Sequence, residues 1–116
     1  MFFKNLFNKK KKQTSSDTLI IKICSSLELL LEKSTTLNEN FNEEKNKLQT
    51  MNEKSKLLVP IEEILSAKME QELLTKITST SFACDMALTG SENDFCENLN
   101  ALESLLNQRL ALQKKN

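Results

Sequence analysis

Residues 20–58 read IIKICSSLELLLEKSTTLNENFNEEKNKLQTMNEKSKLL, and apolar side chains recur through this stretch at alternating steps of three and four residues. Nine of the twelve positions in this register are apolar, which predicts a helix with a coiled-coil-like packing seam rather than a surface helix. The register runs through Ile20, Ile23, Leu27, Leu30, Ser34, Leu37, Phe41, Glu44, Leu48, Met51, Ser55 and Leu58.

One short segment of this stretch favours a break in the helix. Ser34, Thr35 and Thr36 are three weak helix formers in a row, and Thr36 with Glu39 has the spacing of a capping box. The stretch therefore forms either one continuous helix or two helices that separate near Ser34–Thr36, and we expect the continuous form.

Two residues divide the rest of the chain. Pro60 suits the first turn of a second helix, and Gly90, the single glycine, is placed to end that helix with a positive φ. Ser91 is a suitable N-cap for a third helix, and Arg109 suits the negative pole at its end. We expect an all-α fold, an antiparallel bundle of three helices, or four if the first one breaks.

The apolar residues of the two later helices predict which faces are buried. In the second helix they recur every four residues, and two further residues widen this face: Ile61, Leu65, Met69, Leu73 and Ile77, with Ile64 and Leu74. In the third helix the face comprises Phe95, Leu99, Leu102, Leu105, Leu106 and Leu110.

The charge is distributed unevenly. Residues 1–12 carry five Lys and no acid, residues 13–113 carry nine basic and sixteen acidic groups, and Lys114 and Lys115 follow. We therefore separate a basic, Phe-rich segment (residues 1–16), either disordered or in contact with a membrane, from a bundle domain (residues 17–116). The acidic body argues against a nucleic-acid partner.

The opening MFFKNLFNKKKK is the stretch with the most specific signal. On a helix, four apolar side chains would share one arc, and a run of lysines follows; such a segment is typical of a reversible anchor on anionic membranes. The membrane-contact residues would be Phe2, Phe3, Leu6, Phe7, Lys9, Lys10, Lys11 and Lys12. A disordered tail is the equal alternative, and docking into a protein groove is the third.

The residue types argue against catalysis. The chain has no His, the commonest general base, and with a single Gly it has no phosphate-binding glycine loop. Cys24, Cys84 and Cys96 lack metal-ligand spacing and suit reduced, small apolar residues. We expect no enzyme activity, no small-molecule substrate, no metal and no cofactor.

Self-association is expected from the helix lengths, because the second and third helices are too short to cover a straight first helix. The residues left uncovered, which would contact a second copy of the chain, would be Leu37, Phe41, Leu48, Met51 and Leu58. The favoured function is a self-associating scaffold or adaptor, attached by its N-terminus to the cytoplasmic face of a membrane. The alternative is a soluble cytosolic binding module or small chaperone, which requires an apolar groove left open when the protein is alone.

Overall fold

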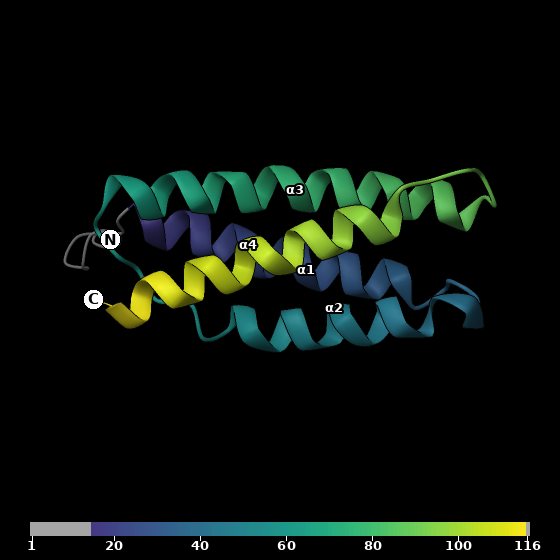
Figure 1. Ribbon diagram of the computed structural model, residues 1–116, viewed down its shortest axis with the longest axis horizontal. Coiled ribbons are helices and arrows are strands. Elements are labelled where there is room, and N and C mark those ends of the chain that lie inside the picture. The colour runs from purple at the N-terminus through teal and green to yellow at the C-terminus, as the bar shows by residue number, and fades with distance from the viewer. Residues whose placement is uncertain (1–14, 116) are drawn as a thin grey trace, which may run out of the picture.

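The computed structural model describes residues 15–115, and the regular structure of these residues is entirely helical. It comprises α1 (Ser15–Ser34), α2 (Asn42–Ser55), α3 (Ile64–Leu88) and α4 (Phe95–Lys115), with a short 3-10 helix, η1 (Glu39–Phe41), before α2. The all-α bundle is confirmed for this part of the chain, in its four-helix form (Figure 1).

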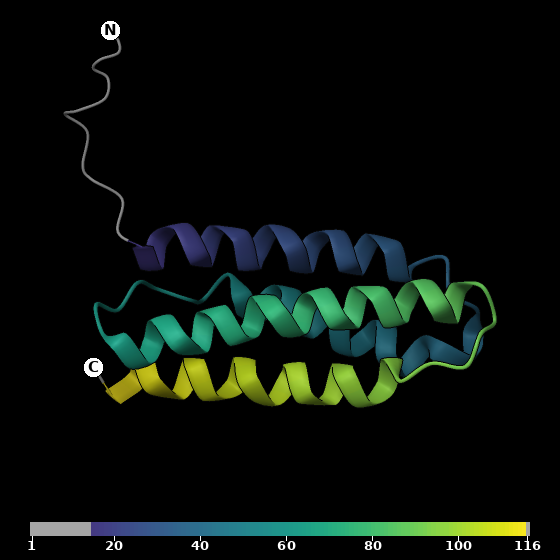
Figure 2. The ribbon, with the colours of Figure 1, turned by 90° about the horizontal axis from the view of Figure 1, so that it is seen from above.

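The four helices form two antiparallel hairpins, α1–α2 and α3–α4, which lie side by side (Figures 1 and 2). α1 packs against α2 and α3, and α4 packs against α2 and α3. Because α1 and α3 both begin at the same end of the bundle, these neighbours run parallel, as α2 and α4 do. Helices α2 and α3, although consecutive, are diagonal to each other, so the chain crosses the bundle between them.

The expected continuous first helix is wrong: α1 ends at Ser34 and α2 begins at Asn42. The hydroxyls of Ser34, Thr35 and Thr36 each donate a hydrogen bond to the carbonyl three residues earlier, at 2.7, 2.7 and 3.0 Å. The backbone N–H groups of residues 35–37 also bond three residues back, which tightens the last turn and ends the helix.

The chain then reverses direction between the end of α1 and the start of α2. Asn38, rather than Thr36, is the N-cap, and its side chain accepts a hydrogen bond from the Asn40 N–H at 2.8 Å in the start of η1. Leu37 lies in the turn itself and is buried, so the apolar register continues through the reversal.

Gly90 behaves as expected, with φ of 77° directly after α3. The Gly90 N–H donates to the Ala87 carbonyl and the Ser91 N–H to the Met86 carbonyl, the two bonds of a Schellman motif. Ser91 is not the N-cap of α4, because the helix begins four residues later, at Phe95, whose N–H bonds to the Asn93 Oδ1 at 3.0 Å.

Pro60 does not occupy the first turn of α3, which begins at Ile64. The residues between α2 and α3 instead form an irregular connection, residues 56–63. Leu58 of this connection is buried, whereas its neighbours Leu57 and Val59 are exposed. The connection thus supplies a core side chain beyond the end of α2.

The core is mainly aliphatic and follows heptad-like spacing on every helix. On α3 the buried positions are Ser66, Glu70, Leu73, Ile77, Thr80 and Cys84, with Ala83 beside the last, and on α4 they are Phe95, Leu99, Leu102, Leu106 and Arg109. The four-residue spacing expected for α3 is therefore corrected to alternating steps of four and three, and it leaves Ile64 and Leu65 exposed.

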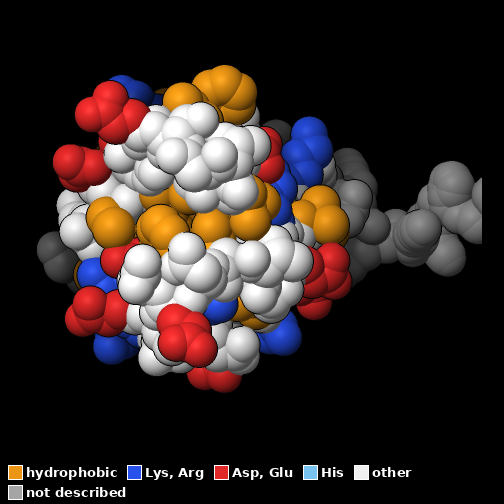
Figure 3. Space-filling view, turned by 90° about the vertical axis from the view of Figure 1, so that its right-hand side faces the viewer, with side chains coloured by type: hydrophobic (Ala, Val, Ile, Leu, Met, Phe, Trp, Pro, Cys, Tyr) orange, Lys and Arg blue, Asp and Glu red, His pale blue; other side chains and the backbone are white. Residues whose placement is uncertain are grey.

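Seen from the end that carries the α1–α2 and α3–α4 turns, hydrophobic side chains form a band across the middle of the bundle (Figure 3). Charged side chains surround this band at the rim. The rings of Phe41 and Phe95 pack edge to face, with centroids 5.9 Å apart, so each hairpin contributes an aromatic side chain to the core.

Candidate functional site

A buried ion pair joins α3 to α4 toward the other end of the bundle. The Arg109 Nε donates a hydrogen bond to the Glu70 Oε2 at 2.8 Å, the Arg109 Nη2 forms an ion pair with the same oxygen at 2.7 Å, and both side chains are fully buried. The hydrogen bond between the two charged groups is charge-assisted and excluded from water. Neither residue stands out in the sequence as a functional one.

The same arginine holds the connection between α2 and α3. The Arg109 Nη2 donates to the Val59 carbonyl at 2.7 Å, and its Nη1 donates to the Gln113 Oε1 at 3.0 Å. Gln113 in turn accepts from the Val59 N–H at 3.0 Å and donates to the Leu57 carbonyl at 2.8 Å. Side chains of α4 thus satisfy three backbone groups of the connection: the Leu57 carbonyl, the Val59 N–H and the Val59 carbonyl.

A surface groove between α1 and α3 is the strongest candidate for binding. It has a volume of about 540 Å³, and the residues that line it come from both helices: Ser26, Leu29, Leu30, Lys33, Ile77, Thr78, Ser81 and Phe82. Leu30 and Ile77 are buried, whereas Leu29 is 65% exposed and Phe82 is 67% exposed. We call this feature the α1–α3 groove.

Lys33 spans the α1–α3 groove. Its Nζ donates to the Ser81 Oγ at 2.6 Å and pairs with the Asp85 Oδ1 at 2.9 Å, both on α3. The pair is partly solvated, so its contribution to stability is small, but it fixes the spacing of the two helices beside Leu29 and Phe82.

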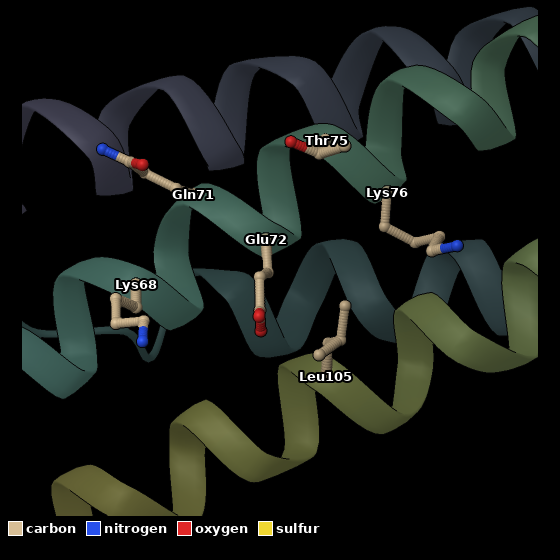
Figure 4. Close-up of a pocket in the computed structure, with 6 residues that line it drawn as sticks. All are labelled: Lys68, Gln71, Glu72, Thr75, Lys76 and Leu105. Atoms are coloured by element: carbon tan, nitrogen blue, oxygen red, sulfur yellow. The ribbon is translucent and has the colours of Figure 1, made fainter.

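A second groove, between α3 and α4, has a different character. It is about 570 Å³ in volume and is lined by Lys68, Gln71, Glu72, Thr75, Lys76 and Leu105. Figure 4 shows Lys68, Glu72 and Lys76 on the side of α3 that faces α4, with Leu105 directed toward them. This charged surface offers a single apolar contact, so it is a weaker candidate for a protein or small-molecule site.

A second group of exposed apolar side chains follows the chain from the connection between α2 and α3 into the first turn of α3. Its members are within nine residues of one another, and between 50% and 83% of each is exposed: Leu57, Val59, Ile64 and Leu65. Glu62 and Glu63, both exposed, stand among them. We call these four apolar residues the 57–65 patch.

The three cysteines are free thiols in three different environments. Cys84 is buried, and burial is the main reason why its pKa is raised. Cys96 is exposed and donates to the Glu44 Oε2 at 2.9 Å, and this bond is the largest of several causes that raise its pKa to about 11. Cys24 donates to the Ser55 carbonyl at 3.3 Å across α1 and α2.

The residues expected to bind a second copy lie inside the bundle. Leu37, Leu48, Met51 and Leu58 are buried, and Phe41 is half-buried against the core. The expectation assumed a long first helix without sufficient cover, and the break at Ser34 removes that assumption, since α2 folds back onto α1.

The expected membrane-contact residues, Phe2, Phe3, Leu6, Phe7 and Lys9 to Lys12, lie outside the described residues. Within residues 15–115, no helix combines the length and apolarity that crossing a membrane requires. The same residues contain no cluster of His, Cys, Asp and Glu that could hold a metal ion.

Comparison of this chain with protein-family models, with curated proteins and with solved structures gave no match.

Proposed function

We propose that the protein is a non-enzymatic helical adaptor that binds an amphipathic helix of a partner protein in the α1–α3 groove. The observation that carries this proposal is the pair Leu29 and Phe82, each about two-thirds exposed beside a groove with a buried apolar floor. Large apolar side chains at such a place gain most from a partner that removes them from water.

The spacing of the residues that line the groove on α1 favours a helix as the bound element. The lining residues of α1 are Ser26, Leu29, Leu30 and Lys33, which are spaced as one face of a helix. A partner helix can lie along such a face and place apolar anchors three or four residues apart between the walls. The Ser and Thr hydroxyls on the α3 side would border these anchors.

Site-specific photocrosslinking in the native cells tests this part of the proposal. A photoreactive residue at Thr78 should capture a protein, and Leu29→Asp with Phe82→Asp should abolish the capture. The control is Leu88→Asp, at an exposed position on α3 outside both the groove and the 57–65 patch. Sedimentation of the purified protein distinguishes a different partner from a second copy. Equal capture by the double variant would reject the groove.

We also propose that residues 2–12 attach the adaptor reversibly to an anionic membrane. The four apolar residues and the lysine run support this part, and α1 places the junction with this segment, Ser15, at the end of the bundle where α3 begins. Vesicle flotation tests it: Phe3→Asp with Phe7→Asp should abolish binding, and added salt should weaken it. Absence of flotation at low salt would reject membrane attachment and leave protein binding as the function.

A further inference from the structure

We propose that the N-terminal segment, residues 2–12, docks on the 57–65 patch of its own bundle and that a membrane competes for it there. Three observations carry this inference: the apolar exposure of the patch, its charge, and the short link between the segment and the end of the bundle where α3 begins.

The patch offers exposed aliphatic side chains to the mainly aromatic apolar residues of the segment. Ile64 is 83% exposed, the highest value among the large apolar side chains that the structure describes, and Leu57, Val59 and Leu65 are at least half exposed. The segment carries Phe2, Phe3, Leu6 and Phe7. Contact between the two sets removes apolar surface from water on both sides.

The charges are complementary. Glu62 and Glu63 are exposed within the patch, and Lys9 to Lys12 follow the apolar residues of the segment. Residues 15–115 contain eleven basic and sixteen acidic groups, a net charge of −5, whereas residues 1–14 contain five lysines and no acid, a net charge of +5. The bundle therefore attracts the segment, and Glu62 and Glu63 set the place of closest approach.

The segment is linked to the end of the bundle where α3 begins by a short stretch of chain. The segment joins α1 at Ser15, at the end of the bundle where α3 begins with Ile64 and Leu65 (Figures 1 and 2). Residues 8–14 lie between Phe7 and Ser15, and seven residues extend to about 23 Å. A link of this length gives an effective concentration in the millimolar range, so even weak contacts hold the segment in place.

Docking would regulate membrane attachment, and this consequence rests on the proposed function, whereas the docking itself does not. The aromatic residues that would enter a lipid surface are the ones held by the patch. The protein would attach when a membrane of sufficient anionic charge outcompetes Glu62, Glu63 and the patch for the same segment.

Methyl NMR of the full-length protein tests the docking without any membrane. Phe3→Asp with Phe7→Asp should shift the methyl signals of Ile64 and Leu65, and the matched double variant Asn5→Asp with Asn8→Asp, which changes the charge equally, should shift them much less. Unshifted methyl signals in the first variant would overturn the docking. The wild-type signals should not change on dilution, and a change would show that the segment comes from a second copy, which also overturns the proposal.

Flotation with vesicles of phosphatidylserine and phosphatidylcholine tests the competition. Ile64→Asn with Leu65→Asn leaves the charge unchanged and should raise the bound fraction several-fold, because the segment is released, whereas Leu88→Asn at the opposite end should have no effect. A lower bound fraction for the double variant would show that the patch itself contacts lipid and would overturn the competition. If no variant floats, membrane attachment fails, and the NMR result still decides the docking.

Discussion

At the scale of single residues, the pair Glu70 and Arg109 is the most consequential contact in the core. Burial of two charges costs free energy that their attraction does not always offset, so such a pair commonly adds specificity rather than stability. Here Arg109 also bonds Val59 and Gln113, and it thereby fixes the path of the connection relative to α3 and α4.

Loss of one member of the pair should therefore be costly. Arg109→Met leaves the Glu70 carboxylate buried without its cation, and we expect the free energy of unfolding to fall by about 3–5 kcal/mol in urea titrations. Glu70→Met in the same background should restore a large part of this loss, because no unpaired charge remains. A double variant no more stable than Arg109→Met alone would contradict the coupling. Lys114→Met, at an exposed position on α4, is the control.

Cys96 offers a second test at this scale. Its pKa of about 11, raised first by the bond to Glu44, leaves little thiolate at pH 8, and the thiolate is the species that reacts with iodoacetamide. Glu44→Gln removes the carboxylate charge and should lower this pKa, so alkylation at pH 8 should accelerate on the order of tenfold or more.

Peptide mass spectrometry separates Cys96 from Cys24 and Cys84 in this measurement. Glu43→Gln removes a neighbouring charge that does not bond the thiol and should change the rate little. An unchanged rate for Glu44→Gln would show that the bond to Glu44 does not control the thiol.

At the scale of elements, the register of residues 20–58 identified the buried side of the chain but not its reversal. Ser34, Leu37, Leu48 and Met51 are buried as their positions in the register indicate. A heptad pattern is equally compatible with one rod or with two helices folded back on each other, because both arrangements bury the same side chains. At the break itself, the Ser34–Thr36 hydroxyls bond to carbonyls three residues earlier, an arrangement that the apolar register does not encode.

The start of α3 escaped prediction for a different reason. Pro60 is a good local signal, but the connection before α3 is held by Arg109 and Gln113, which are about fifty residues away in the sequence. The burial of Glu70 and Arg109, in contrast, is indicated by the sequence. Steps of four and three place Glu70 and Arg109 in the buried registers of α3 and α4, and opposite charges at two such positions indicate a buried pair.

Gly90, which follows the end of α3, allows a test of the cap that ends this helix. Gly90 has φ of 77°, and a Cβ added there would meet nothing within 4 Å, so the cost of Gly90→Ala is purely conformational. We expect a loss of about 1 kcal/mol, observed as a lower melting temperature. Gly90→Asn should lose less, since Asn tolerates this backbone conformation. Equal melting of wild type and Gly90→Ala would contradict the Schellman cap.

At the scale of the whole molecule, the arrangement of two hairpins explains why the seam is covered within one chain. Leu48 is fully buried between its neighbours, so Leu48→Lys should unfold the bundle rather than dissociate a dimer. Circular dichroism should show loss of cooperative melting, whereas Gln49→Lys, at the exposed neighbouring position, should melt like the wild type. A folded Leu48→Lys monomer would contradict burial of the seam within the chain.

The diagonal connection between the hairpins also orders events during protein synthesis. The carbonyl of Val59 bonds Arg109, which the ribosome adds 50 residues later. At about 5–20 residues per second, this interval lasts roughly 2.5–10 s. During that time the first hairpin can form from its own local contacts, but Val59 in the connection lacks its hydrogen bond from Arg109, and α1 stays uncovered until α3 has been made. The inner surface of α2 stays exposed longer, until α4 has been made, and this is the interval in which a chaperone would bind the nascent chain.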